Sequence, residues 1–232
     1  MLAHLVALVV PPCCAACRAP GLKPDEALCA ACRRALPWLP AATCERCGLP
    51  RPCGRRCPAA DAAFERAWSA VAYEGVARDA VRALKFARAR TLADVMAAQL
   101  AACVPPALLL PPGTTLVPVP AHPRRRRARG FDPAELLGAT LARRTGLPLQ
   151  RSLRRERSAA RQLGASRSQR RDRDRDRLGF TAVGCAPSRA VLVDDVHTTG
   201  ATLDACASAL RSAGSRSVAA ITWARTLDEG RR

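Results

Sequence analysis

The chain has almost no lysine and few aromatic residues. Lysine occurs only at Lys23 and Lys85, so all but two of the 38 cationic side chains are arginine, and the formal net charge is +19. Arginine suits planar, bidentate partners such as phosphates. A genomic preference for arginine codons would give the same pattern, so charge alone indicates a polyanionic partner only weakly. Aromatic residues make up 3% of the chain, which leaves alanine, leucine and valine for the core and few platforms for stacking nucleic-acid bases.

The chain also lacks a long hydrophobic run. Its apolar N-terminal stretch, "MLAHLVALVV", ends at Pro11 and Pro12 and is too short to span a bilayer. The stretch has no basic n-region and no A-x-A-like cleavage site. We therefore expect a short helix over residues 1–12 that packs on the body, with a signal peptide as the alternative. This pattern predicts no membrane insertion and a cytoplasmic location.

Two common glycine motifs of nucleotide-binding proteins are missing. Neither G-x-x-x-x-G-K-[ST] nor G-x-G-x-x-G occurs, which argues against the P-loop and Rossmann classes. A length of 232 residues fits one domain with an appended module better than two full domains.

Cysteine, in contrast, is concentrated near the N-terminus. Nine of the 12 cysteines lie between Cys13 and Cys57, which places a compositional boundary near residue 60. Three Cys-x2-Cys pairs and one Cys-x3-Cys pair supply four knuckles, enough for two tetrahedral Zn²⁺ ions. The predicted ligands, with Cys13 left over, are Cys14, Cys17, Cys29, Cys32, Cys44, Cys47, Cys53 and Cys57.

The spacing favours sequential pairing of the knuckles, and an interleaved arrangement stays open. A disulfide framework is the rival interpretation, but it requires an oxidising compartment; a redox Cys-x-x-Cys is another. Four-cysteine sites leave no open coordination position, so the zinc would be structural. We predict a double zinc-binding domain over residues 13–60 and a larger domain over residues 61–232.

The larger domain alternates between strand-like and helix-like patterns. A strand over residues 66–75 precedes one long helix or two over residues 76–104. An extended run follows at 114–122, where the prolines indicate a strand end or a sheet edge. A helix then starts at its N-cap Asp132 and stops at Gly146.

The C-terminal part predicts a βαβ unit. The apolar strand "AVLVDD" (190–195) leads into a helix over 198–214 and a second buried strand, "SVAAITWA" (217–224). We therefore predict an α/β fold with a mostly parallel central sheet. The charged segment 154–177 has no apolar periodicity and is interpreted as a solvated linker or as a mobile lid over an anionic substrate.

Asp194 and Asp195 come at the carboxyl end of a predicted strand, where ligands bind in such sheets. The next helix begins near Gly200, so its backbone N–H groups and dipole favour a phosphate. Two carboxylates would repel that phosphate, so we expect them to accept from vicinal hydroxyls with Mg²⁺ nearby. A ribose with a 5-phosphate fits this arrangement. Hydroxyl donors in the same loop are Thr198, Thr199 and Thr202.

The stretch "VLVDDVHTTGAT" (191–202) resembles the 5-phosphoribosyl-1-pyrophosphate (PRPP) signature of type I phosphoribosyltransferases. In that signature an apolar strand, two acids and two further residues precede a Thr/Gly-rich loop. Other motifs narrow the resemblance, namely the cysteine knuckles, "ALKFAR" (83–88), "VPVPAHPRRRRARGFDPAELL" (117–137) and "RQLGASRSQRR" (161–171). In this order of parts the whole chain resembles the ComF family, which includes ComFC and GntX-like proteins.

The resemblance implies a type I phosphoribosyltransferase-like fold that binds PRPP with Mg²⁺. It implies that Asp194 and Asp195 hold the ribose hydroxyls. The segment 154–177 occupies the place of the family's flexible loop. The residues that would wrap the 5-phosphate are Thr198, Thr199, Gly200, Ala201 and Thr202. Candidates for contact with the pyrophosphate are Lys85, Arg124, Arg125 and Arg129.

Three positions depart from the family pattern. Asp132 follows "RGF" where the family often has asparagine, and His197 stands where the signature usually has an apolar residue. A histidine tolerated at a strand-to-loop junction is preferred over a catalytic role for His197. Thr198 lies where some relatives keep an acidic base, so no catalytic base is carried over.

Three functions stay open on the sequence alone. The first is a PRPP-binding enzyme or sensor, with no acceptor assigned, linked to competence and to the uptake or processing of transforming DNA. The second is a non-catalytic single-stranded DNA-binding or scaffold protein that acts beside a helicase-like partner. The third is a zinc-dependent interaction module.

Overall fold

The computed structural model describes residues 13–23, 25–86, 89–156 and 179–227. The helix predicted over residues 1–12 and most of the segment 154–177 lie outside the described residues. Within those ranges, no helix combines the length and the hydrophobicity that crossing a bilayer requires.

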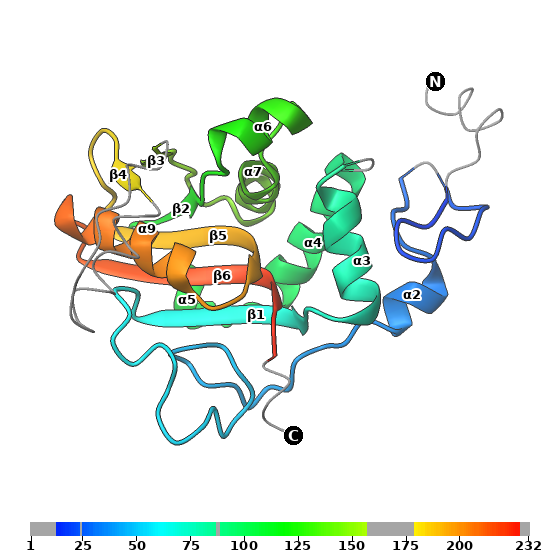
Figure 1. Ribbon diagram of the computed structural model, residues 1–232, viewed down its shortest axis with the longest axis horizontal. Helices are drawn as coiled ribbons and strands as arrows, with labels where there is room; N and C mark the ends of the chain where they lie inside the picture. Colours follow the sequence, from blue (N-terminus) through cyan, green and yellow to red (C-terminus); the bar gives the residue numbers. More distant parts are fainter. Residues whose placement is uncertain (1–12, 24, 87–88, 157–178, 228–232) are drawn as a thin grey trace, which may run out of the picture.

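Four parallel strands form the central sheet, in the order β1-β6-β5-β2 (Figure 1). Strand β1 spans Arg66–Ala72, β2 spans Thr114–Pro118, β5 spans Arg189–His197 and β6 spans Ser217–Arg225. The side chains of the two central strands are buried on both faces of the sheet, which explains their nearly continuous apolar sequences. The predicted α/β class with a mostly parallel sheet is confirmed.

Helices cover both faces of this sheet (Figure 1). On one face, α4 (Ala89–Cys103) and α7 (Pro133–Thr145) pack beside α3 (Gly75–Leu84), with Val191 and Val193 of β5 in the same core. On the other face, Leu192 packs with α9 (Ala201–Ser212). Alternate side chains of β5 therefore feed two separate cores, as the two-residue period of a strand requires.

The structure refines one helix prediction and confirms the bounds of another. The region 76–104 contains two helices, α3 and α4, and not one. The predicted N-cap is confirmed, since the Asp132 side chain accepts from the backbone N–H of Ala134 at the start of α7. The predicted stop is also confirmed, since Gly146 has a φ of 72°. A short helix, α5 (Pro106–Leu109), follows α4.

Strand β2 lies at one end of the sheet order, in agreement with its prolines. Pro118 is its last residue, and a proline has no N–H to donate to a ladder. On the outer side, Leu116 forms a single bridge with Leu149. The chain then continues into α6 (Pro123–Arg129), so β2 delivers an arginine-rich helix to the carboxyl end of the sheet.

Two strand predictions need correction. Strand β5 runs to His197 and not to Asp195, because its pairing with β6 continues as far as Arg225. The charged segment starts within a strand, since β3 (Leu153–Arg155) pairs antiparallel with β4 (Phe180–Ala182). Leu153 and Phe180 are buried and anchor this hairpin to the core below α9, an apolar contact hidden by the surrounding charge.

The cysteine-rich head, which is the double zinc-binding domain predicted over residues 13–60, lies along the outer edge of β1. The N–H of Leu39 donates to the Ala70 carbonyl at 3.0 Å, and the N–H of Ala72 donates to the Pro37 carbonyl at 2.8 Å. The N–H of Ala67 donates to the Glu45 carbonyl at 2.9 Å. An exposed strand edge invites unwanted pairing, and the head, which includes α2 (Ala30–Arg34), covers this one.

Candidate functional site

The acid loop, defined as residues 194–202, joins β5 to α9 at the carboxyl end of the sheet. Asp194 is paired in register with Thr222 of β6, so the two acids are part of the sheet and not of a mobile turn. Parallel sheets bind ligands at this edge. The structure therefore brings together the acids and the Thr/Gly-rich segment that the sequence placed in one site.

The two acids have different surroundings. The Asp195 carboxylate is 2.9 Å from the Lys85 ammonium at the end of α3, and its side chain is 10% exposed. Asp194 accepts from the backbone N–H of Asp195 at 2.8 Å. Part of Asp194 is open to solvent, yet dense packing and the neighbouring Asp195 charge raise its pKa well above the usual value, while Lys85 opposes the rise. These surroundings favour the neutral form of Asp194 more than water does.

The segment from Thr198 to Gly200 is shaped for close backbone approach. Gly200 has a φ of 86° and directly precedes α9, and a Cβ there would lie 2.8 Å from Nε2 of His197. Both the dihedral and the contact therefore favour glycine. Thr198 and Thr199 are exposed, and the Thr199 hydroxyl accepts from the Ala201 N–H at 3.3 Å. A twelve-residue helix begins here, and its first N–H groups attract anions.

His197 is buried beneath the acid loop. Its side chain is 2% exposed, and its ring meets Phe64 edge-on with the centroids 6.1 Å apart. Burial, with the Arg225 charge, lowers the pKa of His197 to about 3. The ring is therefore neutral near pH 7, which supports the preferred interpretation of a histidine tolerated at this junction.

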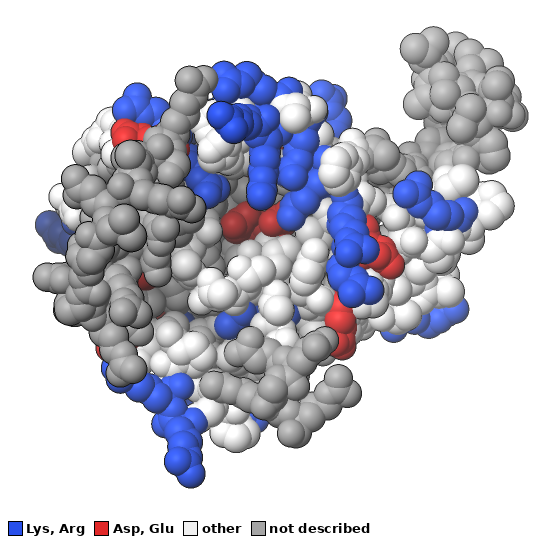
Figure 2. All heavy atoms as spheres, in the orientation of Figure 1, with Lys and Arg blue, Asp and Glu red and all other residues white. Residues whose placement is uncertain are grey.

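The predicted cations divide into two groups. Lys85 contacts Asp195 directly, whereas Arg124 and Arg125 lie exposed on α6. Arg129 has its guanidinium carbon 5.8 Å from the ring centroid of Phe86, a side chain that is 72% exposed. Figure 2 shows basic side chains gathered over α6, above a recessed acidic patch near the end of β5.

Asp132 has a structural role that accounts for its departure from the family pattern. One carboxylate oxygen accepts from the Ala121 N–H at 2.7 Å, and the other caps α7 through the Ala134 N–H at 3.1 Å. Burial raises the pKa of Asp132, although these hydrogen bonds oppose the rise. An asparagine has a single acceptor oxygen, so the carboxylate serves both bonds better.

Arg155 and Arg225 lie at the site but do not stand out in the sequence as candidate site residues. The sequence places Arg155 only in the flexible segment, but the residue lies on β3, where burial lowers its pKa and the charges of Arg125 and Asp194 both act on it. In the sequence, Arg225 directly follows the predicted apolar strand 217–224. In the structure it is buried and donates to backbone carbonyls of the acid loop. An arginine in a buried strand is the one signal that could have marked Arg225.

The eight cysteines form two groups in sequential order. Cys14, Cys17, Cys29 and Cys32 make the first cluster, and Cys44, Cys47, Cys53 and Cys57 make the second, each with all sulfur atoms within 4.8 Å of one another. Sulfur atoms of Cys17 and Cys29 are 3.8 Å apart, and those of Cys44 and Cys57 are 3.9 Å apart. Tetrahedral zinc with bonds of about 2.3 Å places its sulfurs about 3.8 Å apart, whereas a disulfide needs about 2.05 Å. Both clusters fit structural zinc.

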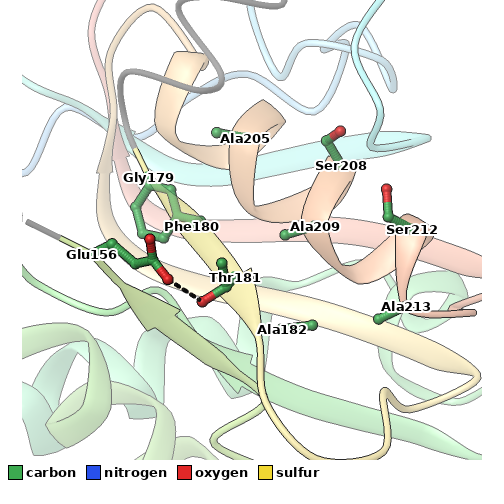
Figure 3. A pocket seen from close by; sticks show the side chains of 10 residues that line it. All are labelled: Glu156, Gly179, Phe180, Thr181, Ala182, Ala205, Ser208, Ala209, Ser212 and Ala213. Carbon is green, nitrogen blue, oxygen red and sulfur yellow. Dashed lines mark hydrogen bonds between the residues drawn. The ribbon is translucent and has the colours of Figure 1, made fainter. Parts of the chain in front are cut away.

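A pocket of about 510 Å³ lies elsewhere, between β4 and α9 (Figure 3). Glu156 lies at one end and accepts from the Thr181 hydroxyl at 3.3 Å, and Ser208 and Ser212 line the helical side. None of its lining residues belongs to the acid loop. Its small, weakly polar side chains gave no sequence signal, and we assign it no ligand.

The geometry of the clusters predicts two zinc ions. Metal analysis of the purified chain should find about two Zn²⁺ per molecule, and a strong chelator should abolish cooperative unfolding, because bound metal supplies the folding free energy of such modules. Well under two zinc ions, or cysteines that resist alkylation until reduced, would contradict the assignment.

The low pKa of His197 predicts that the free energy of unfolding depends on pH. Its folded pKa of about 3 lies below the ordinary 6.5, so the unfolded chain binds the extra proton first as the pH falls. Stability is therefore lost from about pH 6.5 towards pH 3, by at most about 1.4 kcal/mol per pH unit. The urea midpoint of His197→Gln should fall less between pH 6.5 and 5.5 than that of the unmodified chain. Equal falls would show that His197 does not titrate as described.

Residues 5–61 match the double zinc ribbon domain family, in agreement with the two clusters. The chain is 32% identical over 231 residues to DNA utilization protein YhgH from Salmonella typhi. It is 33% identical over 233 residues to the protein of the same name from Salmonella typhimurium, and 31% identical over 233 residues to that from Escherichia coli K12. Each match covers 95% of this chain and 100% of the relative. The chain therefore belongs to the ComF-like family that includes the DNA utilization protein YhgH.

Proposed function

We propose that the acid loop binds PRPP with Mg²⁺, in a type I phosphoribosyltransferase-like domain. One observation carries this proposal: β5 delivers two acids beside the positive-φ Gly200 that opens α9. The loop and helix N-terminus suit a phosphate, and the carboxylates suit hydroxyl groups or Mg²⁺. A single sugar phosphate carries both a phosphate and hydroxyl groups, so one ligand supplies partners for both parts of the acid loop.

In this proposal each residue has a defined part. Thr198, Thr199 and Thr202 donate to the 5-phosphate, with Gly200 and Ala201 giving backbone N–H groups. Asp194 and Asp195 accept from the ribose hydroxyls, and a cation or hydroxyl donors would favour the ionised form of Asp194. Lys85 lies against Asp195, where its charge also suits a pyrophosphate group, and Arg155 and Arg125 supply further positive charge.

The proposal concerns binding and assigns no acceptor for transfer. Thr198 offers a hydroxyl where some relatives have a carboxylate base, and buried His197 is neutral and lies below the loop. A transferase built on this site would work through positioning and electrostatic stabilisation of a leaving pyrophosphate. Its Mg²⁺, when bound, would supply charge neutralisation.

The biological setting that we propose is DNA uptake or processing. The relatives carry the name DNA utilization protein, and a role with transforming DNA would place this chain beside a helicase-like partner. PRPP binding would then link such work to nucleotide supply.

A second candidate, single-stranded DNA binding, is favoured by the surface over α6. Arg124, Arg125, Arg126 and Arg127 are exposed there, and exposed Phe86 lies under the Arg129 guanidinium. Single strands bind where cations follow the backbone and aromatic rings stack on bases. This patch supplies both features in a chain with few aromatic residues.

PRPP with Mg²⁺ should raise the melting temperature of the chain. At about 100 times the dissociation constant the gain is about 2.7 kcal/mol, or roughly 5–10 °C for a chain of this size. Asp194→Asn/Asp195→Asn should lose the shift, whereas Asp79→Asn/Asp94→Asn, which removes two partly exposed acids of α3 and α4 outside the acid loop, should keep it. The measurement is differential scanning fluorimetry; no shift at millimolar PRPP in the unmodified chain would refute the proposal.

If α6 binds single-stranded DNA, affinity should depend on salt through its arginines. Arg124→Ala/Arg125→Ala should reduce the slope of log K against log salt by about 0.7 for each DNA phosphate that no longer meets an arginine. Phe86→Ala should weaken binding with little change in slope. Fluorescence anisotropy with a labelled oligonucleotide measures both. The control Arg143→Ala/Arg144→Ala removes two exposed arginines from α7, and a slope change equal to the control's would rule out α6.

A further inference from the structure

Arg225, at the end of β6, joins the second cysteine cluster to the acid loop. Its side chain is 4% exposed. The Nε group donates to the Cys47 carbonyl at 3.2 Å, and Nη1 donates to the His197 carbonyl at 2.9 Å and to the Thr198 carbonyl. A buried guanidinium requires such acceptors. One side chain therefore fixes the backbone of a cluster cysteine relative to the backbone of the loop.

Phe64 provides a second, apolar connection between the same parts. It lies in the linker between Cys57 and β1, residues 58–65. Phe64 is 1% exposed and contacts the His197 ring edge-on. Nε2 of the same ring lies 2.8 Å from where a Cβ on Gly200 would be. A displacement of the linker would therefore shift His197 and remove the support beneath Gly200.

The linker is itself held by the second cluster. Arg46, which lies between two cluster cysteines, donates to the carbonyls of Ala59 at 3.0 Å and Ala62 at 2.8 Å, and also to those of residues 60 and 65. The N–H of Ala63 then donates to the Asp204 carboxylate at 2.6 Å, in the first turn of α9. The cluster is thus connected to both sides of the Thr198–Gly200 turn.

We propose that zinc in the second cluster sets the geometry of the acid loop, with Arg225 as the positioning residue that links them. The proposal rests on the acid loop as the anion site. Bound metal fixes the positions of the four cysteines. Arg225 and the linker transmit this constraint to residues 197–200. The backbone amides of the loop then keep a geometry that suits a phosphate. The Arg225 charge below the loop adds a favourable field for an anion.

The first cluster supplies an internal comparison. Hydrogen bonds described for its knuckles stay within the head, such as Cys14 N–H to the Ala19 carbonyl and Arg33 N–H to the Cys29 carbonyl. Its residues Cys14 and Cys32 pack in the core beside α3 and α4, on the opposite face of the sheet from α9. Loss of zinc from this cluster should therefore leave residues 197–200 unchanged.

Hydrogen exchange of the full chain tests the link without any ligand. Cys53→Ser should reduce the zinc content to about one ion per chain. It should also speed exchange of the Asp204 and Thr226 amides, which donate to the Gly200 and His197 carbonyls, by at least about tenfold, the effect of losing about one net hydrogen bond. Cys17→Ser should lose one zinc ion equally and leave those amides unchanged. Amides of β2 report any global unfolding.

Arg225→Lys tests the positioning role with both zinc ions retained. Lysine keeps the charge but not the planar fork, so exchange of the Asp204 and Thr226 amides should again rise by about tenfold. Arg211→Lys is the matched control, because Arg211 also joins the linker to the body, through Glu65 and the Arg216 carbonyl, without reaching the loop.

The outcomes separate this inference from the proposed function. Equal exchange of the Asp204 and Thr226 amides in Cys53→Ser and Cys17→Ser, or in Arg225→Lys and Arg211→Lys, overturns the link even if PRPP binds. Faster exchange in Cys53→Ser than in Cys17→Ser, and in Arg225→Lys than in Arg211→Lys, supports the link even if PRPP does not bind. If Cys53→Ser exchanges globally, the Arg225→Lys pair decides.

Discussion

The enclosure of β5 is the constraint on which the candidate site depends. Strands β6 and β2 flank both edges, and α7 and α9 cover the two faces. The apolar side chains of β5 are taken up by this packing, so polar chemistry can begin only where the strand passes beyond the helices. Asp194 is at that point, and its register with Thr222 leaves the acids almost no freedom to move apart.

The head contributes more than a separate zinc-binding module. It covers the open edge of β1, and cysteines of the two clusters extend the two cores of the body, Cys14 on one face and Cys47 on the other. A segment with so little hydrophobic content gains its order from metal. The order of the α/β body at β1 and at the acid loop therefore depends partly on thiolate chemistry at the far end of the sequence.

Local patterns made much of this structure predictable. Cysteine spacing, the N-cap at Asp132 and the apolar run before Asp194 each depend on a few neighbouring residues, and each agrees with the structure. What could not be predicted involves long-range contacts. Arg225 donates to Cys47, 178 positions away in the sequence, and Leu153 pairs with Ala182 across a charged segment. No periodicity in the sequence reports such pairings, because each partner looks ordinary in its own neighbourhood.

The surroundings of the two acids resolve the difficulty of placing them beside an anion site. Lys85 neutralises much of the Asp195 charge at 2.9 Å, and crowding by Asp195 together with burial raises the pKa of Asp194. The field at the loop is therefore set mainly by the N-terminus of α9 and by buried Arg225, both favourable to an anion. A ligand with phosphate at one end and hydroxyls or bound cations at the other would favour the ionised form of Asp194 when it binds. In the proposed function, the acids would discriminate between a bare phosphate and a sugar phosphate, since only the latter supplies partners for both carboxylates.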